Sequence, residues 1–167
     1  MLVSECEKLG YKALAGHTDS VYVTVPEEKA QWLSEHLTNI SHDELKMKYL
    51  DVEWEAYFPY WTTTGTNKNF GIKSYPPEEA GQMKITGFEA KAANAAPITK
   101  QVQLEAFNII SIGGSEQDVY DKLRPTVKKL HKHETDVKDI TTRNRIGRAF
   151  DDYQQPGNGV RAAMYYN

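Results

Sequence analysis

The stretch Tyr11-Lys-Ala-Leu-Ala15, Gly16-His-Thr-Asp19, Ser20-Val-Tyr-Val-Thr-Val25 decides the fold of the amino-terminal part of the chain. It holds two short runs of β-prone residues on either side of a turn that contains glycine and aspartate, which predicts a β-hairpin. A carboxylate at so tight a turn, here Asp19, is held rigidly, as metal-dependent phosphoryl transfer requires. The hairpin turn is therefore the first candidate for a functional site.

The remainder of the first half is predicted to mix helices and strands. Residues 2–9 suit a helix closed by Gly10 in a left-handed cap. Pro26 begins a second helix, which carries acids in its first turn and runs to about Asn39. Two strands are expected near 68–74 and 83–89. Residues 46–60 alternate between apolar and polar, which predicts a long strand with one apolar face made of Leu50, Val52, Trp54, Ala56 and Phe58.

The second half changes to the helical period. Apolar residues from Pro97 onward predict a helix that ends at Gly113-Gly114. Ser115 begins a second helix that runs through about His131, and Pro125 is expected to kink or divide it. A short helix is expected over 160–166. The predicted fold class is α+β, with a β-rich part at 1–95 followed by a helical part at 96–167.

Composition and charge limit the classes of protein to which the chain can belong. An apolar fraction of 40% and a charged fraction of 26% are typical of a soluble globular protein, and no apolar run approaches the length of a membrane span. A single cysteine, Cys6, excludes an internal disulfide, and with no signal-peptide pattern at the amino terminus it favours the cytoplasm. The net charge of −3 argues against a strongly basic nucleic-acid binder. The run from Arg124 to Arg161 is nevertheless richer in Lys, Arg and His, and a local stripe can bind phosphate on an acidic protein.

The turn residues resemble a known motif. Gly16-His17-Thr18-Asp19-Ser20 resembles the palm motif of family B DNA polymerases, commonly Tyr-Gly-Asp-Thr-Asp-Ser. Asp19 matches the second aspartate, which in that family ligates the catalytic metals. His17 stands at the position of the first aspartate, and Ala15 replaces the aromatic residue.

Further segments follow in the order of the same family. Residues 65–72 resemble its basic strand motif, typically Lys-Lys-Arg/Lys-Tyr, and residues 84–91 with 96–103 resemble a Gly-hydrophobic-Glu segment and the helix that enters the thumb in archaeal members. Residues 140–147, 151–153 and 159–163 resemble the end of the thumb. The resemblance covers nearly the whole chain and implies the end of a polymerase palm at 1–95, with antiparallel strands and a helix, followed by a mostly helical thumb at 96–167.

The resemblance also implies a site. It makes Asp19 a catalytic ligand of Mg²⁺ and implies binding of primer-template DNA, with deoxynucleotide binding only when the missing palm and fingers are supplied by an amino-terminal polymerase portion. The residues that it assigns to DNA contact are Thr18, Ser20, Lys68, Asn69, Lys91, Asn94, Lys100, Arg143, Arg145, Arg148, Tyr153 and Arg161.

Departures from the family pattern weaken these expectations. Asn67 and Asn69 stand where Lys or Arg is common, and Ala92-Ala93-Asn94 replaces an Arg-Arg-Asp-like stretch. Each lost cation removes a phosphate contact, which predicts weaker and less salt-sensitive DNA binding. Magnesium prefers oxygen ligands, so His17 indicates weakened or lost catalysis.

Three hypotheses follow from the sequence. The chain is one piece of a DNA polymerase that works only with a partner supplying the rest, or a catalytically inactivated relic that still contacts DNA, or a protein-interaction module on a borrowed fold. The resemblance favours them in that order, and the first two are close.

Overall fold

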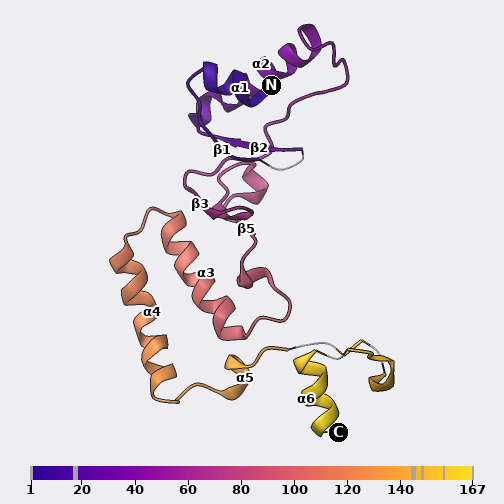
Figure 1. Ribbon diagram of the computed structural model, residues 1–167. Helices are drawn as coiled ribbons and strands as arrows, with labels where there is room; N and C mark the ends of the chain where they lie inside the picture. The colour runs from indigo at the N-terminus through magenta and orange to yellow at the C-terminus, as the bar shows by residue number, and fades with distance from the viewer. Residues whose placement is uncertain (1, 17–18, 144–145, 148, 156, 167) are drawn as a thin grey trace. The chain divides into compact units, whose positions relative to one another are not determined.

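The computed structural model describes the chain except residues 1, 17–18, 144–145, 148, 156 and 167, and the side chain of residue 166 (Figure 1). Its helices and small antiparallel sheets make it an α+β protein, as the sequence predicts. The chain forms two compact units, one of Met1–Gly87 with Phe107–Ser115 and the other of Phe88–Ala106 with Glu116–Asn167. No helix in the described part of the chain is long and apolar enough to cross a membrane.

The first unit opens with a helix, a hairpin and a second helix. The elements are α1 (Leu2–Lys8), β1 (Ala13–Gly16), β2 (Val21–Val23) and α2 (Glu27–Asp43). Gly10 follows α1 with a φ of 84°, the left-handed conformation that its position predicts. Strands β1 and β2 pair antiparallel, from Ala13 opposite Val23 to Gly16 opposite Val21, so the predicted hairpin is confirmed.

A small apolar core lies beneath this hairpin. Cys6 of α1 and Leu33 and Leu37 of α2 are at most 4% exposed and form one cluster. Val23 of β2 and Val52 pack against it, so both the hairpin and the chain beyond α2 rest on the same core.

A three-stranded antiparallel sheet completes the first unit. Its strands β3 (Trp61–Gly65), β4 (Lys68–Ile72) and β5 (Met83–Thr86) are arranged in the order β3-β4-β5. On the central strand Phe70 is 2% exposed, and its ring stacks on that of Phe107 with the centroids 4.0 Å apart. The strands predicted near 68–74 and 83–89 are therefore present, in shorter form.

The long strand predicted over 46–60 is wrong. Residues 47–50 form a turn, the chain from 51 to 56 is not paired in a sheet, and Tyr57 makes only an isolated bridge to Tyr75. The alternation is present from residue 51 onward, because Val52 and Trp54 are half-buried while Asp51, Glu53 and Glu55 are exposed. Leu50, which was assigned to the apolar face, is exposed. The backbone of Val52 is instead bonded to side chains of α2, which replace the neighbouring strand.

The second unit is mostly helical. Its elements are η2 (Glu89–Lys91), the start of α3 (Pro97–Ser111), α4 (Glu116–His131), α5 (Val137–Ile140), η3 (Phe150–Asp152) and α6 (Asn158–Tyr166). Pro125 lies inside α4 and does not divide it. The sequence predicted α3, α4 and α6, whereas α5 was not predicted.

Candidate nucleic-acid interface

The hairpin turn carries the predicted metal ligand. Gly16 ends β1 and Val21 begins β2, so Asp19 lies in the connection, where it is exposed, and Ser20 is half-buried. His17 and Thr18, both named by the sequence prediction, lie outside the described residues. Of the predicted turn residues, the structure therefore places Asp19 and Ser20.

The residues around Asp19 do not by themselves make a magnesium site. In the described part of the chain there is no group of three or more His, Cys, Asp or Glu side chains that could hold a metal ion. Mg²⁺ demands near-octahedral oxygen ligation, and protein carboxylates and substrate phosphates usually share it. Asp19 supplies one carboxylate, so we derive no metal-dependent step from this chain alone.

Aromatic contacts fix the hairpin to the rest of the first unit. The ring of Tyr22 stacks on that of Trp61 with centroids 4.4 Å apart, and Phe58 packs at 4.6 Å from Trp61. The Nζ of Lys84 lies 5.5 Å from the Tyr22 ring centroid and 3.9 Å from the carboxylate of Glu55. Tyr22, three residues beyond Asp19, is therefore packed against aromatic side chains of the first unit.

Burial lowers the pKa of Lys84, but a hydrogen bond with the Tyr22 hydroxyl and nearby carboxylate charges outweigh it, so the net pKa is raised. Lys84 therefore stays cationic beside the hairpin throughout the neutral range.

Two predicted DNA contacts on β4 differ in accessibility. Lys68 is exposed at the start of the strand, next to Asn67, whose φ is 56° in the connecting turn. Asn69 is 2% exposed, and its Oδ1 has no hydrogen-bond partner among the residues that the structure describes. In this conformation Lys68 can reach a phosphate, whereas the side chain of Asn69 is closed off from solvent.

In the second unit, two segments that are distant in sequence meet. The backbone N–H of Arg143 donates to the carbonyl oxygen of Asn94 at 3.2 Å. Lys100, on the first turns of α3, donates from Nζ to the carbonyl of Ala93 at 3.5 Å. Lys91 is exposed at the end of η2. Four predicted DNA-contact residues thus belong to one region, which we call the 94/143 junction: Lys91, Asn94, Lys100 and Arg143.

A side-chain hydrogen bond orients the loop of this junction. The amide N–H of Ala90 donates to Oε1 of Gln103, one turn beyond Lys100 on α3, at 2.7 Å. The loop that carries Lys91 is therefore bonded to α3 at two places, through Ala90 to Gln103 and through Ala93 to Lys100. Such anchoring favours phosphate binding because the cations are held on a common support before a ligand arrives.

The remaining predicted contacts lie in the carboxy-terminal segment. Tyr153 is half-buried, and its hydroxyl accepts a hydrogen bond from the N–H of Gly147 at 3.1 Å. Arg161 on α6 donates to the side-chain oxygen of Asn158, also on α6. Arg145 and Arg148 lie outside the described residues. Tyr153 and Arg161 each bond to a residue of their own segment.

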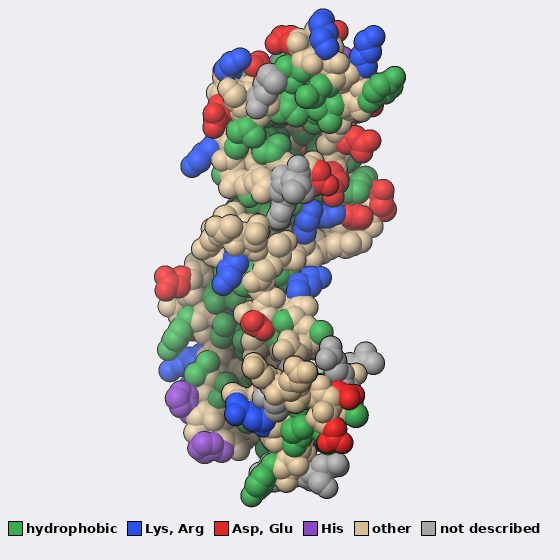
Figure 2. Space-filling view, turned by 45° about the vertical axis from the view of Figure 1, so that its right-hand side comes forward, with side chains coloured by type: hydrophobic (Ala, Val, Ile, Leu, Met, Phe, Trp, Pro, Cys, Tyr) green, Lys and Arg blue, Asp and Glu red, His purple; other side chains and the backbone are tan. Residues whose placement is uncertain are grey.

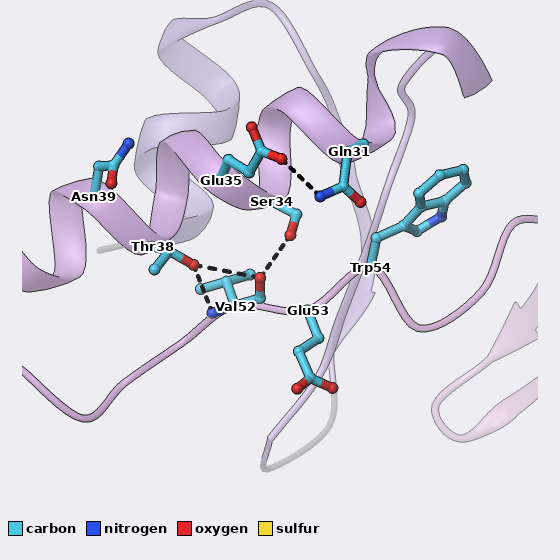
Figure 3. A pocket seen from close by; sticks show the side chains of 8 residues that line it. All are labelled: Gln31, Ser34, Glu35, Thr38, Asn39, Val52, Glu53 and Trp54. Atoms are coloured by element: carbon cyan, nitrogen blue, oxygen red, sulfur yellow. Dashed lines mark hydrogen bonds between the residues drawn. The ribbon is translucent and has the colours of Figure 1, made fainter.

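The sequence did not predict a groove between α2 and residues 52–54, which has a volume of about 450 Å³ (Figure 3). Ser34 and Thr38 point from α2 to the backbone of Val52, and the carboxylate of Glu35 accepts a hydrogen bond from the side chain of Gln31. The i, i+4 spacing of Ser34 and Thr38 is the signal that could have indicated this contact. The hydroxyls of Ser34 and Thr38 are both hydrogen-bonded to the backbone of Val52. The groove therefore has a structural role, in which it joins α2 to the chain at residue 52.

Comparison with known proteins gives the wider context. No protein-family model matches the chain. It is 23% identical over 166 residues, 98% of its length, to a DNA polymerase of a Thermococcus species, of which the match covers 21%. It is 23% identical over 163 residues to DNA polymerase 2 of Aeropyrum pernix, covering 97% of this chain and 19% of the relative. For DNA polymerase 1 of Sulfolobus acidocaldarius the identity is 25% over 162 residues, covering 89% and 17%.

The chain is similar to part of an archaeal DNA polymerase. The similarity extends over most of this chain, as the sequence resemblance predicts, but the chain spans only about a fifth of the length of the polymerases it matches. The activity of those whole proteins therefore does not transfer directly to this chain.

Proposed function

We propose that this chain is the carboxy-terminal palm and thumb portion of a family B DNA-directed DNA polymerase, with the palm part at 1–95 and the thumb part at 96–167. The observation that carries the proposal is the similarity to DNA polymerases along 98% of the chain. The α+β architecture, with a hairpin and small sheet followed by helices, is compatible with it.

In this function the chain binds primer-template DNA. Support comes from the 94/143 junction, where the hydrogen bond between Arg143 and Asn94 brings together cations from two distant segments. Lys68 adds an exposed cation on the first unit. The contacts are to the phosphate backbone, because lysine and arginine on backbone-anchored loops position a duplex without selecting its sequence.

The proposed catalytic contribution is one carboxylate. Asp19 supplies one ligand of a magnesium site that the rest of the polymerase completes, and deoxynucleotide binding likewise depends on that remainder. His17 at the place of the family's other aspartate weakens the site, because imidazole is a poor ligand for Mg²⁺.

A second candidate function is a catalytically inactivated relic that keeps a DNA-binding or protein-interaction role. The burial of Asn69 favours it, since Lys68 is then the exposed cation of the basic strand motif, whose neighbouring polar residue Asn69 is closed off from solvent. The lack of a three-ligand cluster among the described residues is compatible with both candidates.

Duplex binding tests the DNA-binding part shared by the first candidate and the DNA-contacting relic. Fluorescence anisotropy of a fluorescein-labelled primer-template is measured at several low salt concentrations, with and without the amino-terminal polymerase portion. We expect binding that weakens with salt, and a variant with Lys91→Gln, Lys100→Gln and Arg143→Gln that lowers the slope of log K against log salt by about 3. A matched control carries Lys12→Gln, Lys29→Gln and Lys48→Gln, which remove the same charge from exposed sites elsewhere. Absence of binding at the lowest salt, with and without the partner, contradicts DNA binding by this chain.

A further inference from the structure

The carboxy-terminal part of α4 carries a dense set of cations that the proposed function does not use. From residue 122 to residue 132 the sequence contains no Asp or Glu, and every Lys and Arg in that stretch is exposed. These residues are Lys122, Arg124, Lys128, Lys129 and Lys132. Figure 2 shows Lys or Arg side chains and histidines next to one another on this part of the surface.

Three of the cations form a row along one face of the helix. Arg124, Lys128 and Lys132 follow one another at i, i+4 spacing, so they lie on the same face of the helix about 6 Å apart along its axis. Lys132 lies just beyond the end of α4, yet its N–H still bonds to the carbonyl of Lys128 at 3.1 Å, so the row continues through it. We call Arg124, Lys128 and Lys132 the α4 basic row.

The row points away from the interior of the second unit. Val119, Leu123 and Thr126 are the half-buried residues of α4 and recur at the helical period on the other side of the helix. No described residue of α4 is buried. The long side chains of the row are therefore directed to solvent, where a ligand can reach them.

Few carboxylates compete for these cations. The guanidinium of Arg124 lies 5.7 Å from the ring centroid of Tyr120, and the ion pair of Lys132 with Glu134 is long, at 3.9 Å, and exposed. Cations in a last helical turn are favoured by the helix dipole, which accounts for Lys128 and Lys129. The dipole effect falls off within one turn, so it does not account for Lys122 or Arg124.

The composition of the row favours phosphate over a protein partner. Protein interfaces depend on large apolar or aromatic anchors and are depleted in lysine. Val127 and Leu130, the exposed aliphatic residues of α4, lie off the row, and the exposed aromatic residue of α4, Tyr120, lies at its beginning against Arg124. A nucleic-acid strand, by contrast, presents one negative charge for every ~3.4 Å of helix axis, so a row of about 12 Å can face several consecutive phosphates.

We propose that the α4 basic row binds the phosphodiester backbone of a nucleic acid, as a contact separate from the 94/143 junction. The contact is electrostatic and independent of sequence, because none of its members is a side chain held for base recognition. It does not depend on the polymerase assignment, since it uses none of the residues that assignment names.

The test compares four forms of the full chain. They are the wild type, a neutral variant with Arg124→Gln, Lys128→Gln and Lys132→Gln, a charge-keeping variant with Arg124→Lys, Lys128→Arg and Lys132→Arg, and the Lys12, Lys29 and Lys48 control with glutamine at each. Anisotropy is measured over a salt series with a fluorescein-labelled DNA duplex, the corresponding DNA single strand, an RNA duplex and poly-glutamate. Circular dichroism confirms that each variant keeps its helices.

We expect the neutral variant to lose affinity for nucleic acid and its salt slope to fall by about 3 relative to the control, with the charge-keeping variant unchanged. The three nucleic-acid probes then identify the preferred strand form. Equal slopes for the neutral variant and the control overturn the proposal. So does a loss confined to poly-glutamate, which would assign the row to an acidic protein. The variant with Lys91→Gln, Lys100→Gln and Arg143→Gln tests the proposed polymerase function in the same assay. A failure of the α4 basic row and a failure of the proposed function therefore give different results.

Discussion

The backbone N–H of Arg143 donates to the carbonyl oxygen of Asn94 at 3.2 Å, and this bond leaves the guanidinium of Arg143 outside the hydrogen-bonded contact. The fold therefore depends on the backbone at position 143, whereas DNA binding depends on the side chain. We predict that Arg143→Gln leaves the unfolding midpoint unchanged and lowers the salt slope of duplex binding by about 1. Urea denaturation and anisotropy on the same preparation measure both quantities. A large loss of stability without a change in slope would assign Arg143 a structural role instead.

Thr38 anchors the chain beyond α2. Its Oγ1 accepts from the N–H of Val52 at 2.8 Å and donates to the Val52 carbonyl at 3.3 Å, and Ser34 donates to the same carbonyl at 2.6 Å. Thr38→Val removes both bonds of Thr38 and leaves the Val52 N–H unpaired. We expect a loss of about 1–3 kcal/mol in the free energy of unfolding.

Ser34→Ala is the matched control for this contact, because the Val52 carbonyl keeps Thr38 as its donor. We expect it to cost less than Thr38→Val in the same urea titration. Equal losses of unfolding free energy for the two variants would contradict the view that the unpaired Val52 N–H causes most of the destabilisation by Thr38→Val.

Phe70 and Phe107 join the central strand to the last turns of α3. Phe70 is 2% exposed and its ring centroid lies 4.0 Å from that of Phe107. Phe70→Ala removes this stack and opens a cavity, so we predict a destabilisation of about 3–5 kcal/mol by chemical denaturation. Phe70→Leu fills most of the space and is expected to cost clearly less. A loss below about 1 kcal/mol for Phe70→Ala would contradict the central place of this pair.

Cys6 is fully buried in the first unit, and burial raises the pKa of its thiol. The Cys6 thiol loses its proton at a lower pH in the unfolded chain than in the folded chain. Its contribution to the free energy of unfolding is therefore fully present below the ordinary thiol pKa and is lost as the pH rises through the raised pKa of the folded chain. We predict that a disulfide reagent that produces a coloured thiolate labels Cys6 slowly in the native chain at neutral pH and rapidly in denaturant. Rapid labelling of the native chain would show that the α1 contact opens readily.

Local features of the first unit could be predicted from the sequence. The hairpin follows from β-prone runs around a glycine-containing turn, and Gly10 takes the left-handed conformation because its neighbours end a helix. The alternation after residue 50 correctly separated half-buried Val52 and Trp54 from exposed Asp51 and Glu53. It did not predict what the backbone bonds to, because Ser34 and Thr38 occupy a distant helix and periodicity carries no information about partners.

The candidate site shows the same division. The sequence resemblance named Asn94 and Arg143 as separate DNA contacts, but the hydrogen bond between them depends on how the second unit folds. Asn69 was predicted as a DNA contact from its place in a motif, yet it lies on the central strand of the sheet and is 2% exposed. The cations of α4 were visible in composition, and the structure adds that three of them form one exposed row.

Primer extension tests the central claim most directly. The wild-type chain, His17→Asp, and His17→Asp combined with Asp19→Asn are each mixed with the amino-terminal polymerase portion, a primer-template, deoxynucleotides and Mg²⁺. We predict faster extension with His17→Asp than with the wild type, and none with the double variant, because Asp19 then supplies no carboxylate to the metal. Absence of extension with both the wild type and His17→Asp, while both bind the duplex, would contradict the assignment of this chain as a working polymerase portion.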